Sequence, residues 1–240
     1  MNWQNVATIA RKDLAIMMTR RSLRIGLAVL PLGLAVLFSQ IIAHGNFPAS
    51  ALPGTLNAFL FFFMIYTGAL PANLASYSMV GEKVERSLEP LLATPASDGE
   101  ILLGKALAAL LPPLVVMWAG MVTLMALCDA FTHATLGYLY FPNWLAAVTV
   151  FGLAPLLGIM AVAFSVLMSA RVSEVRTAQQ LGALAAIPGA GLYIGLVSGA
   201  FSLDMTSLAV MCGILVVVDT ALALAARATF HREEILTRWA

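Results

Sequence analysis

Six stretches of this chain are each long and apolar enough to cross a lipid bilayer as an α-helix. A helix needs about 20 mostly apolar residues to span the hydrocarbon core. The stretches that meet this requirement are Leu23–Ala43, Leu56–Val80, Leu102–Leu127, Trp144–Ser169, Ala178–Val197 and Thr206–Ala226. Membrane-spanning β-strands would instead alternate apolar and polar residues over about ten positions. The sequence therefore predicts an all-α polytopic membrane protein, in which residues 1–240 form a single transmembrane domain.

The composition excludes the main classes of soluble protein. Hydrophobic residues make up 61% of the chain and charged residues only 10%, whereas a soluble domain is about half apolar and about a quarter charged. A soluble enzyme could not hide so much apolar surface, and a disordered chain would not contain it. Cys128 and Cys212 lie in apolar stretches with no histidine nearby, so we expect neither a disulfide framework nor a metal site.

The 13 basic residues all fall in segments that six spans would place on one side of the membrane. They lie in the N-terminal segment, in the connections after the second and fourth spans, and in the C-terminal tail, with Arg24 and Lys105 in the first turns of the adjoining spans. The other three connections have no Lys or Arg; these are residues 44–55, 128–143 and 198–205. Their only charges are Asp129 and Asp204. Because basic segments stay on the cytoplasmic side, we expect both termini to be cytoplasmic.

The segment before the first span, residues 2–21, is too short and too polar to cross the membrane. Its apolar residues recur at helical spacing and form one stripe: Trp3, Val6, Ala7, Ala10, Leu14, Met17 and Met18. This pattern predicts an amphipathic helix that lies in the membrane surface. Such a helix either anchors the first span only or also packs against a cytoplasmic partner.

The connection after the second span, residues 81–101, is the longest and most charged of the predicted inside connections. Its leucine-rich stripe is formed by Val84, Leu88, Leu91 and Leu92, and its acidic stripe by Glu82, Glu85 and Glu89. Pro90 should bend or interrupt this short helix. Ser97 and Glu100 form a capping box that starts the third span. An ordinary solvated loop would leave the leucines uncovered, so the pattern favours a docking segment for a partner.

Two other features of the predicted inside face need an interpretation. Residues 99–106 read GEILLGKA, which resembles a phosphate-binding loop but ends in Ala where that motif needs Ser or Thr to hold magnesium. We therefore expect this chain to bind no ATP and no other cofactor. The connection after the fourth span places Glu174 between Arg171 and Arg176. These three residues form either a local charge cluster or a second docking contact.

Polar residues within the spans are candidates for a translocation path. The clearest is Asp219 in the sixth span, because a charge in hydrocarbon is costly and usually faces the bundle interior or water. A hydrogen bond to a neighbouring span and a contact with substrate are both open roles for it. Five amide-bearing residues are weaker candidates, since such residues often join helices: Gln40, Asn57, Asn73, Gln179 and Gln180.

The segment that continues from the second span into the third resembles the signature region of type-2 ABC transporter permeases, the export-type membrane subunits. The matching residues are Glu82, Lys83, Glu85, Arg86, Leu88, Glu89, Leu91, Leu92, Ala93, Thr94, Pro95, Ser97, Gly104 and Lys105. The six spans and the amphipathic N-terminal helix are also similar to that family. Pro90 departs from its pattern, and so does the short connection 198–205.

The resemblance implies that the chain is a transporter subunit rather than an enzyme. It would pair with a second permease chain, identical or related, and with cytoplasmic subunits that bind ATP and Mg²⁺. The coupling residues would be Glu82, Glu85, Arg86, Leu88, Glu89, Leu91 and Leu92. The expected location is the cytoplasmic (inner) membrane of a bacterium or an archaeon. A secondary transporter and a polytopic membrane enzyme are the alternatives, but we find no inverted repeat and no converging catalytic groups.

Overall fold

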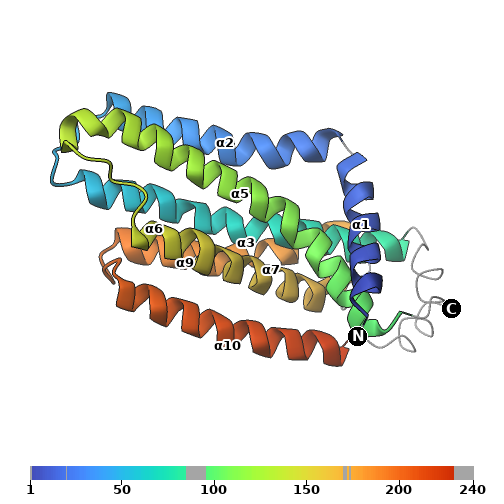
Figure 1. Ribbon diagram of the computed structural model, residues 1–240. Helices are drawn as coiled ribbons and strands as arrows, with labels where there is room; N and C mark the ends of the chain where they lie inside the picture. The colour runs from blue at the N-terminus through green and yellow to red at the C-terminus, as the bar shows by residue number, and fades with distance from the viewer. Residues whose placement is uncertain (1, 20, 85–95, 170–171, 173, 230–240) are drawn as a thin grey trace.

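The computed structural model describes residues 2–19, 21–84, 96–169, 172 and 174–229. These residues form helices and no β-strand, and six of the helical segments are long and apolar enough to cross a membrane. The predicted all-α polytopic fold is therefore confirmed. The six spans lie side by side along one long axis, and the N-terminal helix crosses one end of the bundle (Figure 1).

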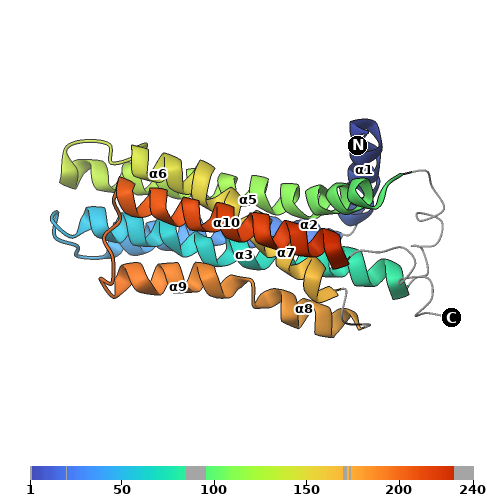
Figure 2. The same cartoon turned by 90° about the horizontal axis from the view of Figure 1, so that it is seen from below.

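The order of the described helical segments follows the six spans. The elements are α1 (Trp3–Thr19), α2 (Arg21–His44), α3 (Leu52–Val84), α5 (Asp98–Leu136), α6 (Trp144–Val148), a π-helical turn η1 (Thr149–Leu153), α7 (Ala154–Ser169), α8 (Val175–Ala183), α9 (Ala186–Val197) and α10 (Met205–Thr229). The fourth span consists of α6, η1 and α7, and the fifth consists of α8 and α9. Figure 2 shows the same bundle from below, with α10 and α9 on its outer surface.

The third span is longer than predicted. Its helix α5 has 39 residues, which corresponds to a length of about 58 Å at about 1.5 Å per residue. The hydrocarbon core is only about 30 Å thick, so α5 extends beyond it. The prediction placed residues 128–143 in a connection, but the helix continues through Leu136 and ends where Gly137 adopts a φ of 76°. Hydropathy identifies the part of a helix that lipid requires to be apolar, not the point at which the helix ends.

The helix α3 lies at the centre of the packing. It contacts α5, α7, α8 and α9. Its residues Phe61, Phe63 and Met64 are fully buried, and so are Met117 and Met121 of α5. The outer helices α9 and α10 bury much smaller fractions of their surfaces, so they present apolar side chains to the surroundings.

The fourth span contains a π-helical turn that has an identifiable cause. Pro155 has no backbone N–H, and the N–H of Ala154 bonds to the carbonyl of Thr149 instead of that of Val150. The carbonyl oxygen of Val150 accepts a hydrogen bond of 2.8 Å from the indole Nε1 of Trp118. A side chain of α5 thus satisfies a backbone group that the π-turn releases.

The fifth span is broken, although one continuous helix over 178–197 was predicted. The break lies at Leu184 and Ala185, between α8 and α9. Pro188 cannot donate to the carbonyl of Leu184, which accepts from the N–H of Ile187 at 3.0 Å instead. At this point α3 comes so close that a Cβ atom on Gly68 would lie 2.5 Å from the carbonyl oxygen of Ala185.

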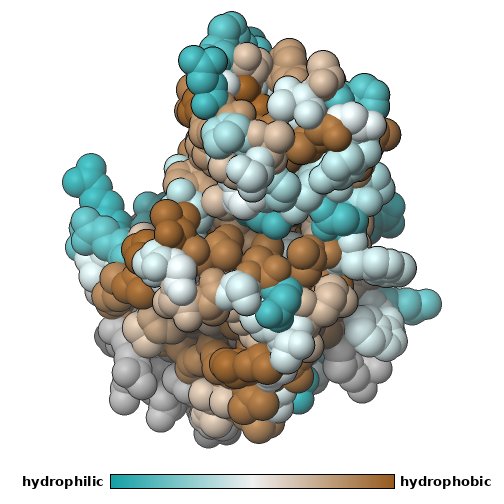
Figure 3. Space-filling model, turned by 90° about the vertical axis from the view of Figure 1, so that its left-hand side faces the viewer, coloured by the Kyte–Doolittle hydropathy of each residue, from teal (hydrophilic) through white to brown (hydrophobic). Residues whose placement is uncertain are grey.

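At the end of the bundle opposite α1, Asp129 is buried rather than part of a solvated connection. Its Oδ1 atom accepts hydrogen bonds from the backbone N–H groups of Tyr140 at 3.0 Å and Phe141 at 3.1 Å. The carboxylate therefore anchors the connection 137–143 to α5. Figure 3 shows this end of the molecule, where hydrophilic and apolar residues are interspersed.

Asp129→Ala is expected to lower the apparent free energy of unfolding by about 1–3 kcal/mol, because the buried N–H of Phe141 and the partly buried N–H of Tyr140 lose their acceptor. Denaturant titration of the purified protein in detergent micelles measures this change. Asp129→Asn keeps one acceptor oxygen and should recover part of the loss. Thr135→Ala, at an exposed position of the same helix, should change the value by less than about 0.5 kcal/mol. Equal stability of Asp129→Ala and the wild type would contradict the anchoring role.

Asp204 also lies at this end, where it caps α10. Its Oδ1 accepts a hydrogen bond of 2.7 Å from the N–H of Ser207, and the hydroxyl of Ser202 donates to its Oδ2 at 3.1 Å. These hydrogen bonds hold the pKa of the exposed Asp204 carboxyl below its usual value. The sixth span thus begins at a defined residue.

Candidate functional site

The end of the bundle crossed by α1 is rich in basic residues, and we call it the basic end. The segments that meet there are the starts of α2, α5 and α8 and the ends of α3, α7 and α10 (Figure 1). Arg21, Arg24, Lys105, Arg176 and Arg227 all lie in the helix turns that reach this end. The connection predicted to dock a partner leaves the bundle at the basic end, between Val84 and Asp98.

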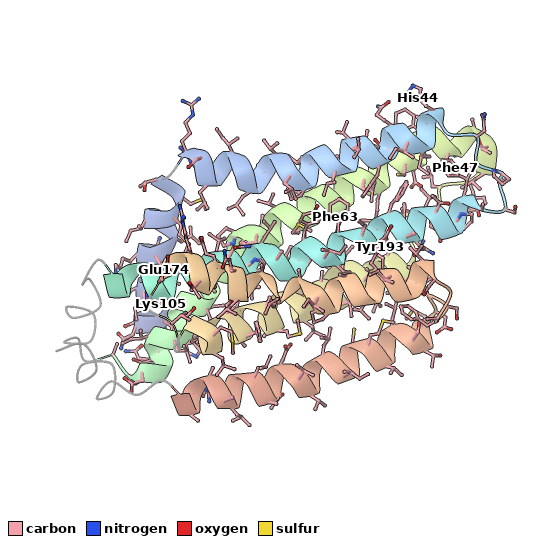
Figure 4. The ribbon with its side chains drawn as sticks, turned by 180° about the vertical axis from the view of Figure 1, so that it is seen from behind. His44, Phe47, Phe63, Lys105, Glu174 and Tyr193 are labelled. Atoms are coloured by element: carbon pink, nitrogen blue, oxygen red, sulfur yellow. The ribbon has the colours of Figure 1, made fainter. Side chains whose placement is uncertain are left out.

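Most of the predicted coupling residues lie outside the described part of the chain. These are Glu85, Arg86, Leu88, Glu89, Leu91 and Leu92, together with Pro90. Glu82 lies in the last turn of α3. Of the second predicted docking cluster, Arg171 lies outside the description, while Glu174 and Arg176 are both exposed at the start of α8. Figure 4 shows Glu174 at the same end of the bundle as Lys105.

The capping box predicted at the start of the third span is confirmed, and it has an additional role. The side chain of Ser97 accepts from the N–H of Glu100, and Oε2 of Glu100 accepts from the N–H of Ser97 at 3.1 Å. The Glu100 carboxylate also accepts from the N–H of Asn2 at 2.5 Å and from Nδ2 of Asn5 at 2.9 Å. One side chain therefore caps α5 and binds the first turn of α1.

A buried ion pair connects the same two helices. Nζ of Lys105 lies 3.1 Å from Oδ2 of Asp13, and the two side chains are only 1% and 3% exposed. Nζ of Lys12 lies 3.8 Å from the other carboxylate oxygen, at the exposed edge of the pair. A buried ion pair requires such close geometry, because both groups have lost their hydration.

Gly104 allows α1 to approach α5 closely. A Cβ atom at this position would lie 2.8 Å from Cγ2 of Ile9 and 3.1 Å from the carbonyl oxygen of Val6. The Gly-Lys pair of the sequence signature therefore has a structural explanation, in which Gly104 makes room for α1 and Lys105 binds its carboxylate. Together with Glu100, these contacts form what we call the α1–α5 latch.

The buried face of α1 differs from the predicted stripe. The residues that α1 buries are Val6, Ile9, Asp13 and Met17. Trp3 and Ala7, which were assigned to the apolar stripe, are exposed, and so is the apolar side chain of Ile16. One face of α1 thus packs on α5 while apolar residues remain on its open surface, as expected for a helix at a membrane surface. The sequence analysis did not single out Asp13. It could have been noticed as an acidic residue that shares the helical spacing of the apolar residues Val6, Ile9 and Met17.

A pocket of about 260 Å³ lies beside the latch, between α1, α2, α3 and α8. Its walls are mostly apolar, and the side chains of Asn73 and Gln179 contribute amide groups to them. Nδ2 of Asn73 donates to the carbonyl of Ala69 at 2.8 Å. Asn73 and Gln179 are two of the five amide-bearing residues named from the sequence, and the structure brings these two to one pocket. Apolar walls with a few polar groups are typical of a site for a small or amphipathic ligand.

Asp219 lies in a different part of the bundle. It is 8% exposed on α10, which packs on α7 and contributes no residue to the pocket that contains Asn73. Neither carboxylate oxygen has a hydrogen-bond partner within the described part of the chain. The structural hydrogen bond considered for Asp219 is therefore not found among these residues.

A scan against protein-family models finds no match for this chain, and a search of curated proteins finds none either.

Proposed function

We propose that this chain is the membrane-spanning permease subunit of an ATP-driven exporter of the type-2 ABC class. In this proposal the chain forms half of the translocation path and pairs with a second permease chain. A separate cytoplasmic subunit binds and hydrolyses ATP with Mg²⁺. The basic end faces the cytoplasm, because basic segments favour that side.

The observation that carries this proposal is that the helices on either side of the acidic, leucine-rich connection, α3 at Val84 and α5 at Asp98, both reach the basic end. This connection directly joins α3, the central helix of the bundle, to α5, whose first turns bind α1 through the latch. A partner that binds this connection would therefore act on two spans and on α1 together. Leu88, Leu91 and Leu92 follow i, i+3 and i+4 spacing in the sequence, a spacing at which apolar side chains can insert into a groove of an ATP-binding subunit. Closure of the ATP-binding subunits then moves the connection, and the spans follow.

The pocket with Asn73 and Gln179 supports the transport role in a second way. Ile16 and Met17 of α1 line this pocket together with residues of α2, α3 and α8, so a movement of α1 relative to α2 and α3 would change its shape. We assign this pocket to the entry of the translocation path.

Leu88→Ala and Glu85→Ala are expected to weaken binding of the ATP-binding subunit by about tenfold or more, because each would remove a central docking side chain. Co-purification from cells that express the permease together with ATP-binding subunits encoded in the same genome measures this. Leu139→Ala is a matched control, since Leu139 is exposed at the opposite end of the bundle.

Two outcomes would contradict the proposal. The first is undiminished co-purification of the ATP-binding subunit with both variants. The second is transport by the purified chain alone in proteoliposomes, driven by an ion gradient without ATP, which would favour a secondary transporter. Stimulation of ATP hydrolysis in the reconstituted complex across a panel of compounds would identify the substrate class.

A further inference from the structure

A second cavity lies on the other side of the bundle, in a groove between α5, α7 and α10. Its volume is about 280 Å³. The helix α10 packs on α7 and leaves this groove open against the first half of α5. The lining residues are apolar except for Arg227, and representative ones are Leu103, Leu107, Ile159, Val166 and Ala223. The groove shares no residue with the pocket that contains Asn73.

The length and direction of the groove match one leaflet of a bilayer. Along α5 it extends from Gly99 to Leu110, a distance of about 16 Å at about 1.5 Å per residue. One leaflet contributes about half of the 30 Å hydrocarbon core. Gly99 lies in the first turn of α5 and Arg227 in the last turn of α10, so a groove of this length would run from the membrane boundary toward the bilayer centre.

Arg227 supplies a charge at the boundary end of the groove. Its side chain is exposed, and it forms no ion pair with any residue that the structure describes. A guanidinium at this position can donate two hydrogen bonds to a phosphate group. An occupant with an apolar chain of one leaflet's length and an anionic head matches both ends of the groove.

We propose that this groove binds one acyl chain of an anionic phospholipid, whose phosphate headgroup is held by Arg227. The lipid fills the groove between α5, α7 and α10. It stabilises the sixth span, whose own packing on the bundle is limited to one face. This role is independent of the ATP-binding partner and of the translocation path.

The test uses the full-length protein in phosphatidylcholine vesicles that contain spin-labelled phosphatidylglycerol or spin-labelled phosphatidylcholine. Electron paramagnetic resonance measures the motionally restricted lipid. We expect the wild type to prefer phosphatidylglycerol at this site by about fivefold. Arg227→Gln should abolish the preference. Ala223→Trp should fill the groove and reduce the restricted population for both lipids.

Two matched variants separate a defined site from general attraction to a basic surface. Ala221→Trp adds the same bulk to an exposed position of α10 outside the groove, and Arg24→Gln removes an exposed charge at the same end of the bundle. Neither should change the restricted lipid. Equal binding of the two lipids by the wild type, no effect of Ala223→Trp, or an equal effect of Arg24→Gln and Arg227→Gln would each overturn the proposal. Occupation of the groove by a second protein chain, seen as a change of oligomeric state in Ala223→Trp, would also overturn it.

Discussion

Replacing Lys105 with Met is expected to lower the apparent free energy of unfolding by about 3–5 kcal/mol. The Asp13 carboxylate is 3% exposed and its Oδ2 atom lies 3.1 Å from Nζ of Lys105. Methionine fills a similar volume but removes the buried cation, so the carboxylate keeps the cost of its lost hydration without its main compensation. We therefore expect α1 to detach from the start of α5. Denaturant titration in detergent micelles, with protease sensitivity of residues 2–19 as a local probe, measures both effects.

The double variant Asp13→Leu with Lys105→Met shows whether the loss of stability comes from the unpaired carboxylate or from the methionine side chain itself. Replacing both charges with apolar residues should restore most of the stability, because a buried ion pair adds little beyond a well-packed apolar pair. Lys12→Met is the surface control. The Lys12 side chain is 44% exposed and 3.8 Å from Asp13, and we expect a change of less than about 1 kcal/mol. The ion pair would be dispensable if Lys105→Met were as stable as Lys12→Met.

The latch also links this prediction to transport. If α1 moves with α5 through Asp13, Lys105 and Glu100, then Lys105→Met should reduce the stimulation of ATP hydrolysis by substrate even where the ATP-binding subunit still binds. Docking and coupling would then be separable, the first depending on the connection after α3 and the second on the latch.

The positions of the spans could be predicted from sequence because lipid imposes one simple requirement. Any helix in the hydrocarbon core must be apolar over about 20 residues, and each of the six predicted stretches overlaps an observed span. The residues at which the helices end are determined by packing against neighbouring segments rather than by hydropathy. Residues 128–136 are less apolar, yet they remain helical in α5 because Cys128, Asp129 and Thr132 are buried against neighbouring segments.

The latch could be predicted only in part. The capping box of Ser97 and Glu100 is a local pattern, and it was found from a spacing of three residues. The ion pair joins Asp13 to Lys105, which are 92 positions apart, and helical periodicity contains no information on such a distance. An apolar stripe read from hydropathy alone also does not show which of its residues face the protein. In a membrane protein, however, Trp3 and Ile16 can remain on the outer surface of α1 at little cost, because lipid surrounds them.

The break in the fifth span also depends on a contact between segments that are distant in the sequence. A proline such as Pro188 favours a kink, but a kink can be absorbed within a continuous helix, as Pro112 and Pro113 are within α5. The break between α8 and α9 depends on what lies opposite. There the backbone of α3 is so close that only glycine fits at Gly68 and Gly189, and no local pattern reveals this contact.

Gly189→Leu is expected to separate α9 from α3 and to lower the apparent free energy of unfolding by about 3 kcal/mol, at the upper end of overpacking effects. A Cβ atom at Gly189 would lie 2.3 Å from the carbonyl oxygen of Met64 and 3.0 Å from the backbone nitrogen of Ile65. These are backbone atoms of the central helix, so no side-chain rotation can relieve the clash. Small residues at such contacts permit the close helix packing on which association within membranes depends.

Gly191→Leu is the matched control, because a Cβ atom at Gly191 would have no neighbour within 4 Å. It lies in the same helix, two residues away, and makes the same change in side-chain volume and helix propensity. We expect its stability to equal or exceed that of the wild type, since glycine is a poor helix former. Gly189→Ala should be intermediate, because its single methyl group already meets the α3 backbone. Equal stability of Gly189→Leu and Gly191→Leu would show that α9 is not held against α3 by close backbone contact.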